Sequence, residues 1–167
     1  LRDPPVGNYF ETGAPSLEAT VLSLNGTRLI FSPGSRTKYS NAGLAVVGRV
    51  LEVLHGRPYS EVMGDLVLSP MGLAESAAFK RDGTVLPRLA KGRMWTYDGR
   101  SFDAPTFELG MSPAGSLYAS VLDLAKFMRG LFGHLPGQGG ELLQPSSLET
   151  MLTPGQASDG SRLPFGI

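Results

Sequence analysis

Apolar residues recur at intervals of three and four along much of the chain, which is the spacing of one helix face. The longest such stripe begins just after Asn41 and consists of Leu44, Val47, Leu51 and Leu54. A second stripe begins after Pro58, whose ring suits the first turn of a helix, and runs through Tyr59, Val62 and Leu66 to Pro70. These patterns predict two consecutive helices separated by a turn at Gly56.

Capping residues mark further predicted helices. Ser16 precedes a short stripe over residues 17–24. Ser120, with Asp123 three positions later, forms a capping box. The apolar residues that follow it are expected to face inward: Leu124, Phe127, Met128 and Leu131.

A second capping box, Ser146 with Glu149, predicts a short helix that Pro154 ends. Residues 79–111 lack helical spacing, and we expect a small hairpin there whose type I′ turn is Asp98-Gly99. The nearby Trp95 would either line a cleft or lie in the core, and we favour the core. The sequence therefore predicts a mainly α chain with little sheet.

Length and composition narrow the class of protein. The chain has 167 residues with 41% apolar and 18% charged residues, which indicates one globular domain. Its formal net charge is zero, so nothing in its charge favours a nucleic acid or an anionic membrane as partner. It has no cysteine for disulfides or thiol catalysis, and no apolar run long enough for a membrane span.

The segment Tyr39-Ser40-Asn41 carries the main candidate chemistry. It follows a Pro33-Gly34 turn and precedes the longest helical stripe. In an extended segment alternate side chains share a side, so Tyr39 and Asn41 are expected to point into one cleft while Ser40 faces back. A phenol can carry a proton, and an amide can both donate and accept hydrogen bonds. The alternative is a turn with Asn41 as helix cap and Tyr39 as a core residue.

The sequence offers no convincing nucleophile of its own. One Ser-x-x-Lys match, Ser35 to Lys38, lies in the turn directly before Tyr39. Such adjacent residues cannot surround one carbonyl from opposite sides, so Ser35 is interpreted as a turn residue. His55 and His134 lack the partners of a triad or metal site, and no metal or organic cofactor is expected.

Three ordered stretches together resemble a known family. They are Pro33-Gly34 with Tyr39-Ser40-Asn41, then Leu68 to Leu73, then Ser112 to Phe127. Their order and spacing resemble the class C β-lactamases, with their relatives the D-alanyl-D-alanine carboxypeptidases, D-stereospecific aminopeptidases and serine esterases, which are penicillin-binding protein-like enzymes.

The resemblance implies a fold and an organisation for the chain. Residues 1–167 would be the helical lobe of the α+β serine β-lactamase/transpeptidase-like fold, as one fragment of a longer β-lactamase-like domain. Within it, residues 1–15 are expected to be loop and residues 163–167 the start of a strand.

The resemblance also implies an acyl-transfer site. Tyr39 would be the general base or proton shuttle, and Asn41 would hold a catalytic lysine and a substrate amide. Ala114, Gly115 and Ser116 would border the substrate pocket, although Ser116 stands where the family usually has a second glycine. The serine nucleophile would lie outside this chain, which alone would be inactive.

Two functional alternatives follow. The first is part of a serine hydrolase that forms an acyl-enzyme on a peptide, lactam or ester carbonyl of a small-molecule or peptide substrate. The second is a non-catalytic relative that uses the cleft for binding or as a structural domain. In either case the isolated chain is expected to self-associate, because it would otherwise expose the apolar face that normally meets the sheet.

Overall fold

The structure is a computed structural model that describes residues 3–8, 11, 13, 15–35, 38–131, 142–156 and 159–162. Its α-helices are α1 (Leu17–Leu22), α2 (Asn41–His55), α3 (Tyr59–Met63), α4 (Val121–Leu131) and α5 (Pro145–Leu152). Shorter helical turns are η1 (Ser23–Gly26), η2 (Gly64–Leu68), η3 (Leu86–Arg88) and η4 (Ser112–Ala114). The strands in the described part are β1 (Arg93–Trp95) and β2 (Ser101–Asp103). The mainly helical prediction is confirmed.

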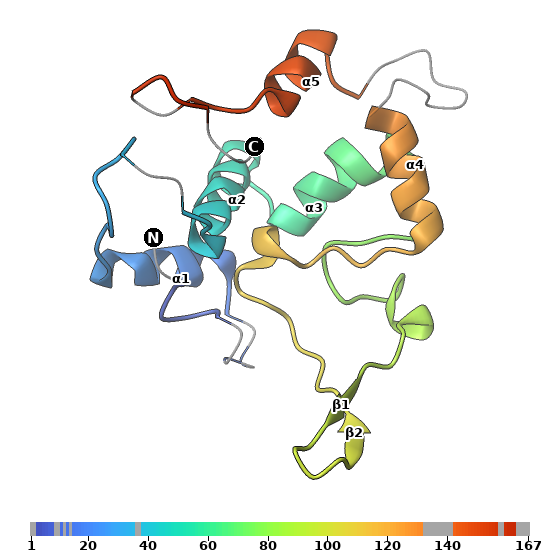
Figure 1. The fold of residues 1–167 in the computed structure, drawn as a ribbon. Coiled ribbons are helices and arrows are strands. Elements are labelled where there is room, and N and C mark those ends of the chain that lie inside the picture. The colour runs from blue at the N-terminus through green and yellow to red at the C-terminus, as the bar shows by residue number, and fades with distance from the viewer. Residues whose placement is uncertain are drawn as a thin grey trace.

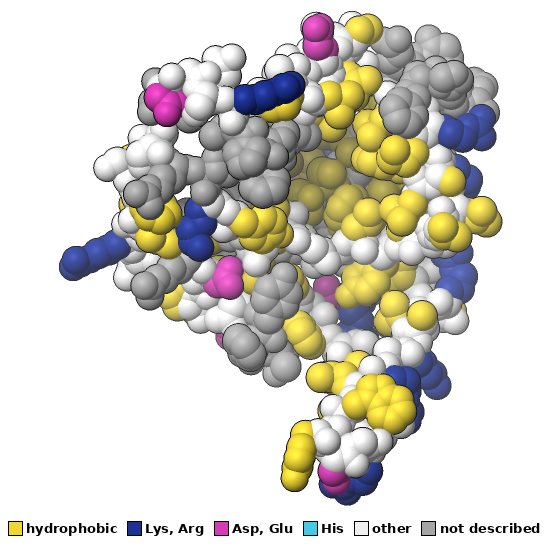
Figure 2. Space-filling view, in the orientation of Figure 1, with side chains coloured by type: hydrophobic (Ala, Val, Ile, Leu, Met, Phe, Trp, Pro, Cys, Tyr) yellow, Lys and Arg dark blue, Asp and Glu magenta, His cyan; other side chains and the backbone are white. Residues whose placement is uncertain are grey.

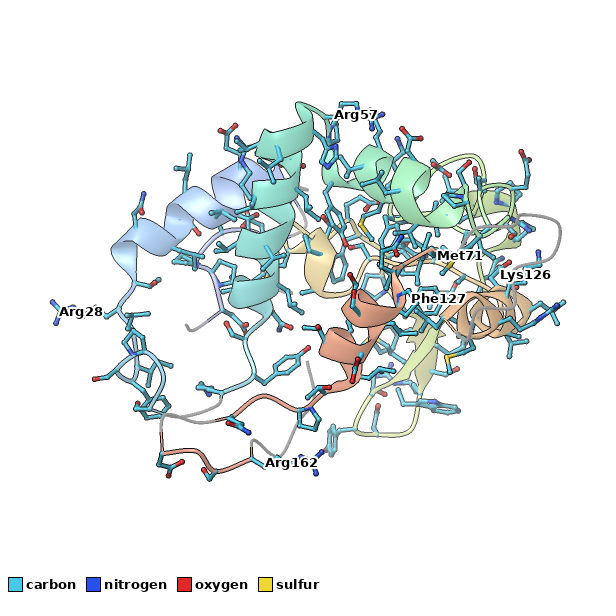
Figure 3. All side chains as sticks on the ribbon, turned by 90° about the horizontal axis from the view of Figure 1, so that it is seen from above. Arg28, Arg57, Met71, Lys126, Phe127 and Arg162 are labelled. Atoms are coloured by element: carbon cyan, nitrogen blue, oxygen red, sulfur yellow. The ribbon has the colours of Figure 1, made fainter. Side chains whose placement is uncertain are left out.

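Helices α1 to α4 are held together by two small apolar clusters. The first joins α1, α2, α3 and the residue before η4, through Leu17, Ala45, Tyr59 and Met111. The second lies around the end of η2 and contains Leu68, Met71, Leu73 and Ala77, with Phe127 of α4 packed against it. Met71 and Phe127 lie close together in the middle of the molecule, whereas Arg28 and Arg57 lie at its edge (Figure 3). The clusters fix α2 and α4 relative to the loop between them.

Helix α2 is confirmed, but most of its apolar stripe does not face the core of this chain, although Leu51 packs against the first cluster. The residues that it buries are Asn41, Ala42, Ala45 and Gly48. Of the predicted stripe, Leu44, Val47 and Leu54 are exposed. Small residues bring the helix close to its neighbours: a Cβ added at Gly48 would lie 2.1 Å from Cγ of Pro113 in η4. The predicted helical spacing is confirmed, but the buried face of α2 lies next to the apolar stripe.

Helix α4 begins at the predicted capping box. The Ser120 N–H donates to Asp123 Oδ2 at 2.8 Å, and the Asp123 N–H donates to Ser120 Oγ at 3.2 Å. The inward orientation predicted for Leu124 and Met128 is wrong, since both are about half exposed. The helix instead buries Asp123 and Gly130.

Asp123 links α4 to the loop after the second cluster. Its side chain is 2% exposed, and its Oδ1 accepts a 2.5 Å hydrogen bond from Ser76 Oγ. Burial raises the pKa of the Asp123 carboxyl, but hydrogen bonds from Ser76 and Ser120 and the charge of Lys126 outweigh burial and hold this pKa below its ordinary value. The ionised carboxylate is therefore the form that the fold stabilises.

Replacement of Asp123 by Asn is expected to lower the free energy of unfolding by about 1–3 kcal/mol at pH 7, because the hydroxyl donors of Ser76 and Ser120 lose a buried, charged acceptor. An unfolded carboxyl titrates near pH ~4 and the native one lower. The contribution of the Asp123 carboxylate to the free energy of unfolding is thus complete above the pKa of the unfolded carboxyl and is lost as the pH falls through the native pKa. Denaturant unfolding at pH 7 and pH 3 should show the variant's deficit shrinking in acid. Asp65→Asn, an exposed ion-pair partner of Arg57, is the control, and an equal deficit at both pH values would contradict the prediction.

The predicted helix after Pro58 is interrupted by a π-type turn. Pro58 directly precedes α3, and the Ser69 N–H donates to the Gly64 carbonyl five residues back at 2.8 Å. This extra residue per turn shifts the register of the stripe. Leu66, predicted on the inner face, is therefore half exposed and Leu68 is buried instead.

Helix α5 begins two residues earlier than its predicted capping box implies. Its N-cap is Gln144, without a side-chain hydrogen bond, and Pro145 occupies the first helical position. Proline fits there because its missing N–H would have no partner in the helix. The Ser146–Glu149 capping box is therefore wrong, while the helix and its end before Pro154 are confirmed.

The predicted hairpin is present and projects away from the helices (Figure 1). Its turn is longer than predicted, because the Thr96 N–H donates to the Arg100 carbonyl and leaves residues 97–99 in the loop, with Gly99 at φ 83°. A positive φ costs glycine little, so Gly99 fits this position. The core position expected for Trp95 is wrong, since its side chain is 71% exposed.

Hydrophobic side chains line a hollow that opens toward the viewer between α2, α3, α4 and α5 (Figure 2). The apolar stripes of α2 and α4 contribute to the exposed surface of the chain. No helix in the described ranges is both long and apolar enough to cross a membrane. The described residues among 1–15 form neither helix nor strand, and the strand expected at 163–167 lies outside the described residues, as does His134.

Candidate functional site

The backbone around Tyr39 places its neighbours at the start of α2. Ser40 is extended, with φ −151° and ψ 108°, and its Oγ accepts a 3.0 Å hydrogen bond from the Gly43 N–H. Ser40 is therefore the helix cap, and Asn41 is the first helical residue. The alternative in which Asn41 caps the helix is wrong, because the hydroxyl one position earlier already satisfies the free N–H group.

Tyr39 and Asn41 have very different surroundings. The side chain of Tyr39 is 76% exposed, and among the described residues its hydroxyl has no hydrogen-bond partner. The alternative of a core tyrosine is therefore wrong. Asn41 is only 9% exposed. No hydrogen bond joins the two side chains within the described part, and the shared cleft stays a prediction.

The carboxamide of Asn41 is half satisfied. Its Nδ2 donates to Asp3 Oδ1 at 3.3 Å. Its Oδ1 is buried and accepts no hydrogen bond from any described residue. A buried acceptor without a donor costs about 1–3 kcal/mol. Proteins rarely keep such a group unless it has a use, so Asn41 Oδ1 is a candidate acceptor for a donor from outside the described residues.

The second candidate region, Ala114 to Ser116, is anchored on α2. It begins with the last residue of η4, whose Pro113 packs against Gly48 of that helix. Ala114 is partly buried against the first cluster. Ser116 is buried, and its N–H donates to the Ser112 carbonyl at 3.0 Å. Gly115 is exposed, and a Cβ there would meet nothing within 4 Å, so this residue has room for a ligand next to its backbone.

The residues after this loop fix its far end. The Tyr118 N–H donates to the Ala78 carbonyl at 2.9 Å, and the Ala78 N–H donates back to the Tyr118 carbonyl at 3.1 Å. Burial, followed by the negative charge of Glu108, raises the pKa of the Tyr118 phenol against the opposing charge of Arg81. The Tyr118 phenol therefore keeps its proton at neutral pH, and the two backbone hydrogen bonds of this residue anchor the loop.

A separate hollow lies at the opposite end of α2 from Tyr39. It measures about 600 Å³, and Arg49, Glu52 and Tyr59 are among its lining residues. Within its lining, Arg49 pairs with both Glu18 and Glu52. None of the described residues that line this hollow has a buried side-chain nitrogen or oxygen atom that lacks a hydrogen-bond partner, as Asn41 Oδ1 does.

The remaining sequence candidates behave as expected of surface residues. Ser35 is exposed, and its Oγ donates to the Ser32 carbonyl at 2.7 Å within the turn. Lys38 is also exposed. The described residues contain no group of three side chains that could hold a metal ion. Sequence reasoning missed Asp3, which lies 38 positions before Asn41, because no local pattern connects a loop aspartate to a distant helix.

Several known proteins are similar to this chain in sequence or in fold. A human protein described as beta-lactamase-like 1 is 32% identical over 135 residues, which are 80% of this chain and 25% of that protein. The octameric penicillin-binding protein homologue from Pyrococcus abyssi has a TM-score of 0.71 at 24% identity, over 89% of this chain and 33% of that one. D-amino acid amidase from Ochrobactrum anthropi has a TM-score of 0.70 at 20% identity, over 88% of this chain and 43% of that one.

The solved structures establish the fold, and the chain spans about a quarter of the length of the curated relatives that it matches. Family membership comes from the sequence itself, which matches the family described as Beta-lactamase over residues 1–166. Since that match runs through the Tyr39-Ser40-Asn41 segment and both clusters, the chain belongs to the Beta-lactamase family.

Proposed function

We propose that this chain is the helical part of a longer serine hydrolase that forms an acyl-enzyme on a peptide, lactam or ester carbonyl. Its family is that of the β-lactamase-like serine hydrolases. The observation that carries the proposal is the buried Oδ1 of Asn41, which has no donor among the described residues and lies at the start of α2, two positions after the exposed Tyr39. An acceptor and a proton carrier at one helix entrance are what such a site needs from this part of the fold.

Tyr39 acts in this proposal as the proton carrier. A serine hydroxyl that attacks a carbonyl must lose its proton, and the leaving group must gain one. A phenol ionises only near pH ~10 in water, so a neighbouring cation is needed to favour the phenolate. The exposure of Tyr39 leaves its hydroxyl open to a lysine ammonium and to the nucleophile.

Asn41 acts as a hydrogen-bonding group for the same centre. Its free Oδ1 accepts from a lysine ammonium or from an N–H of the substrate. Because the residue is the first of α2 and is buried, its position is fixed by the helix. Gly115 lies in the loop that packs on this helix and borders the substrate, where its backbone can approach the ligand closely.

The nucleophile comes from polypeptide outside residues 1–167. The chain's apolar surface supports this part of the proposal, because the stripes of α2 and α4 are regular enough to pack against further elements yet are exposed here. The hollow between the helices is lined by such side chains (Figure 2). In the isolated chain the same surface would be covered by self-association.

The complete polypeptide that contains this chain provides the test. It should hydrolyse a nitrophenyl ester or nitrocefin, and mass spectrometry of a slowly hydrolysed lactam should show an adduct on a serine outside residues 1–167, in a Ser-x-x-Lys sequence. Replacement of that serine by alanine should abolish both signals. An adduct on Ser35 would contradict the placement of the nucleophile. The absence of both turnover and an adduct would favour the non-catalytic relative.

A further inference from the structure

The contact between Asp3 and Asn41 fixes which way the Asn41 carboxamide points. A carboxylate offers only acceptors, so the atom that faces Asp3 Oδ1 at 3.3 Å must be Nδ2, the donor. The oxygen of a planar amide lies on the other side of the group from its nitrogen. The carboxylate of Asp3 therefore determines that Oδ1 is the atom left for another partner, and Oδ1 is the buried atom without a donor.

Asp3 is itself held in place by its own segment. Pro4, the next residue, is fully buried. The Val6 N–H donates to Ser23 Oγ at 3.4 Å, and the Gly7 carbonyl accepts from the Met111 N–H at 3.3 Å. These contacts tie the segment to η1 and to the residue before η4. The aspartate is thus presented to Asn41 by a fixed backbone, although its own side chain is exposed.

Without Asp3 the carboxamide of Asn41 has two nearly equivalent orientations. Oxygen and nitrogen of the amide have similar size, and a half-turn of the group exchanges an acceptor for a donor. A site that must bind an ammonium or an N–H group needs the acceptor. A carboxylate on the far side permits only the orientation in which Nδ2 faces it.

We propose that Asp3 is a positioning residue of the acyl-transfer site, which keeps Oδ1 of Asn41 directed at the cationic or N–H donor of that site. The inference rests on the proposed function and assigns to that site a residue of the N-terminal segment. Asp3 does not touch the substrate and acts only through Asn41.

A double-mutant cycle in the complete protein tests this role, with kcat and KM measured on a nitrophenyl ester. Asp3→Ala is expected to lower kcat/KM about tenfold, and Asp3→Asn less, because an asparagine can accept from Nδ2 but can also donate. Asn41→Ala is expected to lower kcat/KM more. In the Asn41→Ala background, Asp3→Ala should then have no further effect. Asp65→Ala, at an exposed aspartate paired with Arg57, is the matched control and should leave both constants unchanged.

The outcomes separate this inference from the proposed function. The role of Asp3 is overturned if Asp3→Ala lowers kcat/KM by the same factor with and without Asn41. It is also overturned if Asp3→Ala has no effect while Asn41→Ala lowers kcat/KM. In both cases the role of Asn41 stands. If Asn41→Ala leaves turnover unchanged, both roles are overturned. Thermal unfolding of each variant shows whether a loss of rate comes from a loss of fold, and the Asp3→Asn variant keeps the size of the side chain for that comparison.

Discussion

Replacement of Tyr39 by phenylalanine in the complete protein is expected to lower kcat for a nitrophenyl ester by about a hundredfold or more, since removal of a positioned proton carrier typically costs at least that much. The change removes one oxygen from a side chain that is 76% exposed. The fold should therefore be unaffected, because the described residues make no hydrogen bond to that hydroxyl. KM should change much less than kcat, because the proton is transferred only during the reaction.

Tyr97→Phe is the matched control for this measurement. Tyr97 is a fully exposed tyrosine in the hairpin loop, away from α2, and loss of its hydroxyl should leave kcat unchanged. Equal turnover of the Tyr39→Phe variant and the unaltered protein would show that Tyr39 does not carry the proton. A loss of the same size in Tyr97→Phe would show that the assay reports something other than the site.

Gly48→Ala is expected to have the largest effect on stability. The added Cβ would lie 2.1 Å from Cγ and 2.9 Å from Cβ of Pro113. A proline ring cannot rotate away as the end of a flexible side chain can, so α2 and η4 must separate. Overpacking of this kind costs about 1–3 kcal/mol, and the short distance places this variant near the upper value. Denaturant unfolding and the thermal midpoint measure the loss.

Gly43→Ala, on the same helix, provides the control for Gly48→Ala. Its added Cβ would lie 3.6 Å from Cβ of Ser40, which is an ordinary contact. Since alanine favours a helix over glycine by up to about 1 kcal/mol, this variant should be as stable as the unaltered protein or slightly more so. Destabilisation of both variants by the same amount would contradict the importance of the contact with Pro113.

Local chemistry made several elements predictable from the sequence. The capping box of α4 and the cap of α1 need only residues within one turn of each other. The hairpin follows from the turn-forming pair Asp98-Gly99, although the sequence predicted a two-residue turn and the structure leaves residues 97–99 in the loop. The interruption of the helix after α3 was not predictable, because a π-type turn has no clear local pattern.

The sequence by itself determined where the helices lie and that Tyr39 and Asn41 stand at the entrance of α2, since spacing and capping act over a few residues. Only the tertiary structure decided which face of α2 is buried. The apolar stripe is the stronger pattern, but close packing at Gly48 uses the small face. It also decided that Asp3 contacts the carboxamide of Asn41 from 38 positions away, because a contact between distant segments depends on how the whole chain folds and not on local propensity.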